Sequence, residues 1–389
     1  MYYSMTPATF FAEMVSPRFN PAAVLDISQS GKVLVISDLH MGAGYRDDLA
    51  HNGTLLLDML EGYYWQEGWT LVLNGDIEEL LRYSLDTIKK QWVRLYQVFD
   101  RFQAAGRLYK TLGNHDEGLL FELNYPYPLY NAIRIETGII PLYVYHGHQS
   151  SKVYTCYNNL INAGIRYLLK PIGIRNISSA RNPNRRFHVE KHAYRFSLDN
   201  HCISIIGHTH RVLFESLGRF EYIKFEIERL CRDYPASRGA DRERIASEVW
   251  ALRFELSKLK RSERRNVPRQ SLYGDELPVP CLFNSGSAIS RKGVNAIELT
   301  NETIALVYWF IEGRGKKFVS RGGYTIEKLK GTAYCRSVLN QDRLDYVQAK
   351  IELLGKSVFS GYSSGVLPGR EESAESASEI LEELEPEDD

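Results

Sequence analysis

Five short blocks of Asp, His and Asn, several of them containing Gly, constrain this chain more than any other feature. The blocks are Asp38-Leu39-His40, Gly75-Asp76, Gly113-Asn114-His115-Asp116, His146-Gly147-His148 and Gly207-His208-Thr209-His210. Short apolar runs precede four of them, at residues 33–36, 71–73, 142–145 and 203–206. Runs of this length, bounded by Gly or polar residues, are typical of buried strands. We therefore expect the blocks at strand ends, where open α/β sheets place their ligands.

The residue types in these blocks indicate metal chemistry. Carboxylate, imidazole and amide groups suit Mn²⁺, Fe and Zn²⁺. Two such ions about 3.5–4 Å apart can clamp a phosphoryl group while one of them activates water near neutral pH. Any single block is more typical of an ordinary loop, but the joint occurrence of all five favours a two-metal site.

In this order the blocks resemble the calcineurin-like metallophosphoesterase family, whose motifs run D-x-H, G-D, G-N-H-D, H-G-x and G-H-x-H. The turn Asn284-Ser285-Gly286-Ser287 is similar to the family's terminal N-x-G-S. The resemblance implies an α/β fold, a two-sheet β-sandwich flanked by helices. It also implies a hydrolase in which metal-activated water attacks phosphorus.

The resemblance further implies a role for each site residue. The implied ligands are Asp38, His40 and His210 for one ion, Asn114, His146 and His208 for the other, and Asp76 as the bridge between them. His115 would lie beside the phosphate as a cation or general acid, oriented by Asp116, since an imidazole titrates near working pH. The cofactors would be two divalent ions, with Mn²⁺ expected and Fe or Zn²⁺ as alternatives.

Two interruptions of the motif order divide the chain. We expect a lead-in over residues 1–30, a metallophosphoesterase domain over 31–320, a C-terminal extension over 321–369 and an acidic, disordered tail over 370–389. The first insertion, at about 150–200, is predicted to be a helical cap with a basic inner face. Family inserts of this kind select the substrate, so its arginines are candidate phosphate contacts, although each could equally be a surface residue. These arginines are Arg175, Arg181, Arg185 and Arg186.

The second insertion, at about 217–280, contains apolar residues at steps of three and four, which predicts an amphipathic helix over 241–265. Its apolar stripe is expected to pack on this chain, with a homodimer seam as the alternative. The segment 219–269 carries fourteen basic and nine acidic residues, so contact with nucleic acid stays open. Further helices are predicted over 48–64, 85–105 and 339–354, and a hairpin over 296–310.

Charge and composition bound the location and the partners. The formal net charge is zero, but the last twenty residues hold ten acids and one Arg, which leaves the rest of the chain at +9. A basic body favours a phosphate-bearing small molecule through electrostatic steering, and an ordinary solvated surface is the alternative. The absence of a long apolar run or an apparent signal sequence leads us to expect no transmembrane segment and a cytoplasmic location.

The substrate is predicted only as a class. We expect hydrolysis of a phosphomonoester, phosphodiester or pyrophosphate, with a nucleotide or nucleotide-linked compound favoured. The stretch Asp76-Ile77-Glu78-Glu79 is distantly similar to UDP-2,3-diacylglucosamine pyrophosphatases, which carry Arg where this chain has His115 and Asp where it has His148. A metal-dependent nuclease is one alternative, and a non-catalytic scaffold that keeps the fold is another.

Overall fold

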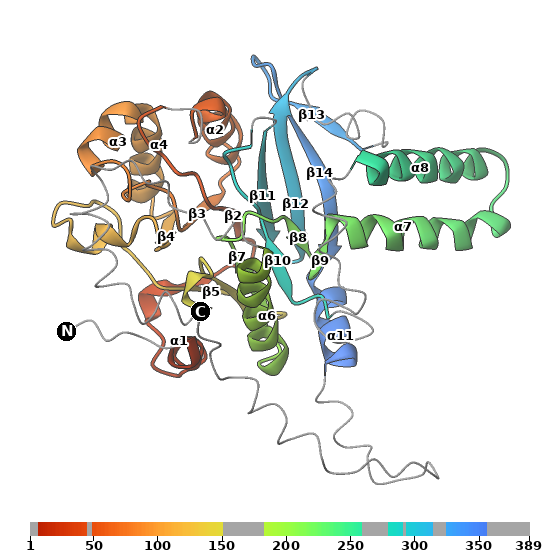
Figure 1. Cartoon of the computed structure of the whole chain (residues 1–389), viewed down its shortest axis with the longest axis horizontal. Helices are drawn as coiled ribbons and strands as arrows, with labels where there is room; N and C mark the ends of the chain where they lie inside the picture. The colour runs from red at the N-terminus through yellow and green to blue at the C-terminus, as the bar shows by residue number, and fades with distance from the viewer. Residues whose placement is uncertain are drawn as a thin grey trace, which may run out of the picture. The chain divides into compact units, whose positions relative to one another are not determined.

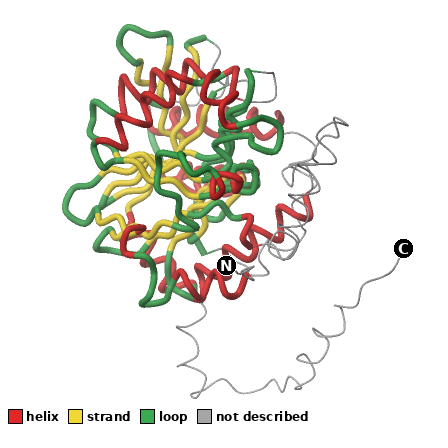
Figure 2. The backbone as a smooth tube through the Cα atoms, turned by 90° about the vertical axis from the view of Figure 1, so that its left-hand side faces the viewer, coloured by secondary structure: helices red, strands yellow, loops and turns green. Residues whose placement is uncertain are grey.

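The structure, a computed structural model, describes residues 7–44, 49–150, 183–258, 279–290, 293–313 and 324–355. Within these residues the strands form two seven-stranded sheets, and helices flank them (Figures 1 and 2). The predicted α/β architecture of two sheets flanked by helices is therefore confirmed.

The first sheet has the strand order β1-β5-β6-β7-β10-β8-β9. Its strands are β1 (Val24–Asp26), β5 (Ile133–Glu136), β6 (Leu142–Val144), β7 (Ile203–Ile206), β10 (Leu282–Asn284), β8 (Leu213–Phe214) and β9 (Leu217–Gly218). Strands β6, β7 and β10 run parallel, with Val144 opposite Ile205 and Ile205 opposite Phe283. Because parallel strands end at the same edge, the loops after β6 and β7 emerge side by side.

The second sheet has the order β13-β14-β12-β11-β2-β3-β4. Its strands are β13 (Ile326–Lys328), β14 (Tyr334–Arg343), β12 (Thr303–Ile311), β11 (Val294–Thr300), β2 (Lys32–Ile36), β3 (Thr70–Asn74) and β4 (Leu108–Thr111). Strands β2, β3 and β4 are parallel. The predicted hairpin is confirmed as β11 and β12, and β11 joins it to β2.

Strand β2 is buried on both faces and fixes the start of the site. Val33 and Val35 belong to a core cluster that they share with the first sheet and with helices α1 (Pro7–Met14) and α6 (Pro183–Asp199). Leu34 and Ile36 point the other way, into a cluster with α2 (Gly53–Met59) and α4 (Val93–Ala104). All four side chains are fully buried, so the end of β2 is held rigidly.

Two predicted helices differ from those observed. The helix predicted over 85–105 is interrupted at Trp92, which separates α3 (Leu85–Gln91) from α4. The Trp92 indole Nε1 donates a hydrogen bond to Gly42 O at 2.9 Å, a tertiary contact that local periodicity does not reveal. The helix predicted over 339–354 begins only at Leu344, as α11 (Leu344–Leu354), because β14 continues to Arg343 in pairing with β12.

The second insertion forms two helices that lie along one another, α7 (Arg219–Asp233) and α8 (Gly239–Lys258) (Figure 1). Helix α8 corresponds to the predicted helix over 241–265, whose last residues lie outside the described part of the chain. Ile245 and Ala251 on α8 are buried, as are Ile223 and Leu230 on α7. Helix α8 thus packs against α7 within this chain, while Val249, Leu252 and Leu256 stay half-buried, and the homodimer stays a prediction.

Short helical turns complete the described chain. Leu60–Tyr64 continues α2 as a π-helical turn, and 3-10 turns occupy Pro21–Ala23, Leu49–His51, Glu117–Phe121, His148–Ser150 and Tyr234–Ala236. None of the helices that the structure describes combines the length and the apolar content required to cross a membrane.

Candidate metal centre

The predicted site residues gather where strands of both sheets end. Asp38 and His40 follow β2, Asp76 follows β3, and His208 follows β7. His40 N donates to Asp76 O at 2.9 Å, which joins neighbouring loops of the second sheet. His208 N donates to the Asp38 carboxylate at 3.1 Å, which joins the two sheets. The fold itself therefore brings together residues that are far apart in the sequence.

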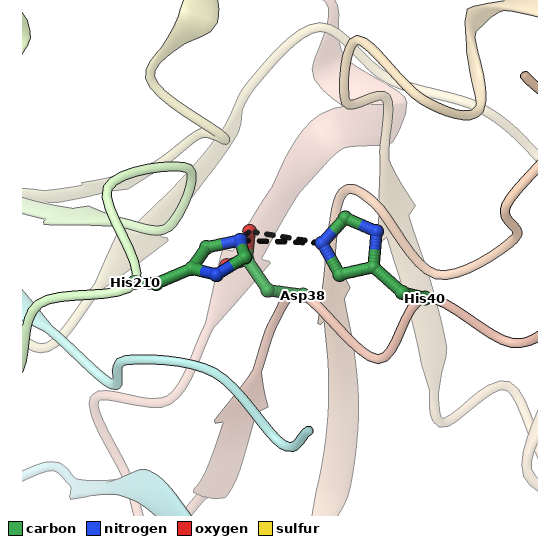
Figure 3. A group of neighbouring side chains, drawn as sticks. All are labelled: Asp38, His40 and His210. Atoms are coloured by element: carbon green, nitrogen blue, oxygen red, sulfur yellow. Dashed lines mark hydrogen bonds and ion pairs between the residues drawn. The ribbon is translucent and has the colours of Figure 1, made fainter. Parts of the chain in front are cut away.

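Asp38, His40 and His210 form one group whose ligand atoms all lie within 4.8 Å of one another, so these residues could hold a metal ion. His210 Nε2 lies 3.0 Å from Asp38 Oδ1. The Nε2 atoms of His40 and His210 face each other at 3.2 Å (Figure 3). His40 Nδ1 lies 2.9 Å from Glu79 Oε2. A proton held on Nδ1 by that carboxylate leaves the Nε2 lone pair directed at the group, as is usual for a metal-binding imidazole.

Asp76, His146 and His208 form a second group of the same kind. His146 Nε2 lies 3.2 Å from Asp76 Oδ2. His146 Nδ1 lies 3.0 Å from Asn74 O, a backbone acceptor that orients the ring. His115 N donates to Asp76 Oδ1 at 2.8 Å, which holds the loop that carries Asn114 against this group.

The residues present fit a pair of divalent ions. The buried Asn114 Oδ1 has no hydrogen-bond partner among the described residues, and His146 Nε2 makes no hydrogen bond although the Asp76 carboxylate lies 3.2 Å away. Leaving an atom such as Asn114 Oδ1 unpartnered costs about 1–3 kcal/mol, and a bound cation would satisfy it. Carboxylate, amide and imidazole donors are suited to Mn²⁺, Fe and Zn²⁺.

Charge within the site keeps its buried carboxylates ionised. Burial alone would raise the pKa of Asp76, but the facing His146 and His115 hold that pKa well below its usual range. Burial likewise opposes ionisation of Asp38, and the charge of His210 lowers its pKa. Both carboxylates are therefore anionic at neutral pH, as ligands must be.

The histidines respond to the same charges in opposite ways. Burial would lower the pKa of His146, but the charge of Asp76 outweighs it and raises the pKa to about 9. Burial would also lower the pKa of His115, but the charges of Asp76 and Glu79 raise that pKa to about 9. Burial and the neighbouring His146 lower the pKa of His208 well below its usual range. A metal ion at this group must therefore displace a proton from His146 at neutral pH.

Glu79, and not Asp116, orients the His115 ring. His115 Nδ1 lies 2.8 Å from Glu79 Oε2. Asp116 instead accepts hydrogen bonds from Gly113 N at 2.6 Å, Ile77 N at 2.9 Å and the Lys110 ammonium at 2.9 Å. The orienting role predicted for Asp116 is wrong in this respect, because its carboxylate is directed into the core beneath the loops.

The sequence motifs assign no role to three further residues around the site. Glu79 and Lys110 belong to none of the five blocks, and His148 is not among the implied ligands. His148, next but one to His146, is buried, and its Nε2 lies 3.0 Å from Glu117 Oε1. For Glu79 the spacing is a usable signal, because a carboxylate three residues after Asp76 falls on the same loop at the end of β3.

The predicted substrate contacts on the first insertion are not placed by the structure. Arg175 and Arg181 lie outside the described residues. Arg185 and Arg186 belong to α6, but their side chains are not described. The second half of the insertion, α6, contributes Val189, among others, to the core.

Five of the seven predicted ligands have left-handed backbone conformations. Their φ angles lie between 46° and 60°, at Asp38, His40, Asp76, His208 and His210. Among residues other than Gly, Asn, Asp and His are enriched several-fold in this region. Such conformations cluster at functional sites, where the surrounding structure enforces them.

Comparisons with known proteins add little to this geometry. No family model and no curated protein matches the chain. Among solved structures, the chain is similar to YfcE, described as a phosphoesterase from E. coli, with a TM-score of 0.31 and 13% sequence identity. The match covers 80% of this chain and 99% of that one. A likeness this distant carries no argument, so the fold and the site rest on the geometry described above.

Proposed function

We propose that this chain is a dinuclear metal-dependent phosphoesterase that hydrolyses a phosphomonoester, phosphodiester or pyrophosphate. One observation carries the proposal. Overlapping groups of potential ligand atoms from both sheets lie at one edge, and the buried Asn114 Oδ1 has no hydrogen-bond partner among the described residues. A site that served only stability would satisfy such atoms within the protein.

In this proposal Asp38, His40 and His210 hold one ion, Asn114, His146 and His208 hold the other, and Asp76 bridges them. When bound, the ions would supply Lewis-acid activation of water and stabilise charge on the phosphoryl group. Mn²⁺ is the ion we expect first, with Fe and Zn²⁺ as alternatives.

His115 is proposed to hold the proton that the leaving oxygen takes up. Its Nδ1 is engaged by Glu79 and its Nε2 lies 4.0 Å from Asp76 Oδ2, on the side of the proposed ions. In the metal-free site burial opposes protonation of His115, but the charges of Asp76 and Glu79 raise its pKa to about 9. A protonated imidazole there can bind a phosphate oxygen and act as general acid.

The substrate is proposed to be a phosphate-bearing small molecule, with a nucleotide or nucleotide-linked compound favoured. Support comes from the excess of basic residues outside the acidic tail, which attracts an anion.

The test is hydrolysis by metal-free protein reloaded in turn with Mn²⁺, Zn²⁺ and Mg²⁺. The panel contains p-nitrophenyl phosphate, bis-p-nitrophenyl phosphate, UDP-sugars and single-stranded DNA. We expect metal to restore hydrolysis of at least one small-molecule phosphate, and Asp76→Asn to lose metal and activity together. Asp86→Asn, at an exposed carboxylate on α3, is the matched control. Full activity of Asp76→Asn, or a wild type that binds no metal, would overturn the proposal.

A further inference from the structure

A fully buried lysine lies directly beneath the two loops of the second sheet that carry Asp76 and Asn114. Lys110 on β4 has a side chain with 0% exposure. Its ammonium donates to Glu78 Oε2 at 2.8 Å and to Asp116 Oδ2 at 2.9 Å. A buried ammonium is rare unless it is paired, and here it is paired twice.

The two carboxylates come one from each loop. Glu78 stands two residues after Asp76, and Asp116 stands two residues after Asn114. Lys110 is thus a cation shared between the loop 75–79 and the loop 113–116. Without it, two buried carboxylates would face each other with no charge between them, an arrangement that forces them apart or forces one to take up a proton.

Asp116 links the Lys110 ammonium to the backbone of both loops, because its carboxylate also accepts two backbone hydrogen bonds. Its Oδ1 accepts from Gly113 N, directly before Asn114, and its Oδ2 also accepts from Ile77 N, directly after Asp76. The loops touch closely, because a Cβ added at Gly113 would lie 2.2 Å from Asp76 Oδ1. A small movement of Asp116 therefore changes the separation of Asp76 from Asn114.

Two tyrosines hold the Glu78 carboxylate on the side away from Lys110. Tyr96 and Tyr125 donate their hydroxyl protons to Glu78 Oε1, at 3.0 and 2.7 Å. With Glu78 held in this way, the Lys110 ammonium has a fixed reference point in the core. None of these contacts reaches the space between the candidate ligand atoms, so Lys110 cannot act on the substrate directly.

We propose that Lys110 is a positioning residue for the metal centre. Its ammonium sets the spacing of the two loops at which Asp76 and Asn114 bind the same ion. The inference rests on the proposed function, because it assigns a role toward an ion that the function requires. It predicts that Lys110 affects the ion at Asn114, His146 and His208, which takes a ligand from each of the two loops, more than the ion at Asp38, His40 and His210, with which it shares only Asp76.

The experiment compares Lys110→Met with the double variant Lys110→Met/Glu78→Gln. Methionine keeps the length of the chain and removes the charge, and the second change removes the repulsion between the carboxylates. Lys32→Met, which removes a partly exposed lysine near Glu67, is the control. Titration calorimetry with Mn²⁺ gives the number and affinity of bound ions, electron paramagnetic resonance reports coupling within the Mn²⁺ pair, and thermal melting reports the fold.

We expect Lys110→Met to bind its first ion as the wild type does and its second ion about 10- to 100-fold more weakly, the usual effect of losing a residue that supports a ligand. The double variant should regain the melting temperature but not the affinity for the second ion or the coupled signal. If the double variant regained the affinity for the second ion as well as the melting temperature, Lys110 would have a role in stability alone and the inference would be overturned. Unchanged binding of the second ion in Lys110→Met, or failure of both variants to fold, would also overturn it.

The wild type separates this inference from the proposed function. A wild-type protein that binds fewer than two ions and hydrolyses nothing on the panel refutes the function itself. A wild type that binds two ions and is active, together with a Lys110→Met variant that does the same, refutes only the role of Lys110.

Discussion

Raising the pH from 7 to 9 should destabilise the metal-free protein through His115 and His146. Both have a folded-state pKa of about 9 against 6.5 in the unfolded chain. Between these values the folded protein binds more protons than the unfolded one, so stability present below pH 6.5 is lost as the pH rises through 9.

The size of the effect follows from the shift. Each pKa unit corresponds to about 1.4 kcal/mol. The two rings share the charge of Asp76 and His146 opposes protonation of His115, so we count one histidine and not two. That gives a loss of about 2 kcal/mol between pH 7 and 9. At about 2 °C per kcal/mol for a long chain, the melting temperature should fall by about 4 °C.

Other shifted groups contribute less within this window. Burial raises the pKa of the Cys202 and Cys281 thiols above the ordinary value of 9.0, so their contribution begins to be lost only near pH 9. His208 has a lowered pKa, so it removes stability only as the pH falls through 6.5. The pKa of Asp342 is raised to about 7 by burial and by Glu215, and most of its contribution to stability is lost as the pH rises from 3.8 to 7. The wild type and Asp76→Asn share these groups, so the difference between their pH dependences isolates the two site histidines.

The assay is thermal melting of chelator-treated protein at pH 7, 8 and 9 and constant ionic strength. Asp76→Asn removes the charge that contributes most to raising the pKa of both histidines, so its melting temperature should fall by clearly less than that of the wild type over this range. Asp86→Asn should keep the wild-type slope. A wild-type melting temperature that is constant or rises toward pH 9, or an Asp76→Asn variant that keeps the slope, would refute the reasoning.

Three further predictions concern the proposed ions. His115→Ala should keep both ions, counted by calorimetry, and lose about 10²- to 10⁴-fold in turnover, the usual contribution of a general acid; unchanged turnover would exclude that role. Gly113→Ala should weaken metal binding, because its Cβ would lie 2.2 Å from Asp76 Oδ1, whereas Gly118→Ala meets only the flexible end of Leu80 at 3.3 Å and should bind normally. Chelation at pH 7 should lower the free energy of unfolding by about 2.7 kcal/mol for each bound ion, relative to protein in metal at a hundred times the dissociation constant, and equal melting curves would argue against bound ions.

The strands could be predicted because their signal is local. The runs before Asp38, Asp76, His146 and His208 each form a strand, since short apolar runs bounded by Gly or polar residues are typical of buried strands. The hairpin of β11 and β12 followed for the same reason. The parallel arrangement then brings the polar ends of these strands together without further information.

The failures share a tertiary cause. Helix periodicity continues through Trp92, but the chain turns there, where the indole reaches Gly42. Residues 339–343 carry a pattern compatible with a helix, and pairing with β12 extends β14 through them. In both cases a contact distant in sequence overrides a weak local preference.

The same division applies to the candidate site. Its proposed ligands could be assigned because Asp, His and Asn at these spacings form a recognisable motif. The residues that support them could not, because Glu79 and Lys110 are ordinary charged residues until the fold shows what each one touches. Asp116 illustrates the point, since it lies next to His115 in sequence and yet bonds to the core.

The left-handed backbone at five of the proposed ligands restricts any attempt to re-engineer the metal preference. Exchanging His40 or His208 for a cysteine, to favour a softer ion, would change the donor atom and also remove a residue type that tolerates a positive φ. A β-branched residue would be worse still, whatever its side chain could coordinate. Libraries at these positions are therefore limited by conformation before coordination chemistry is tested, and Asn, Asp, His and Gly are the residues with which to begin.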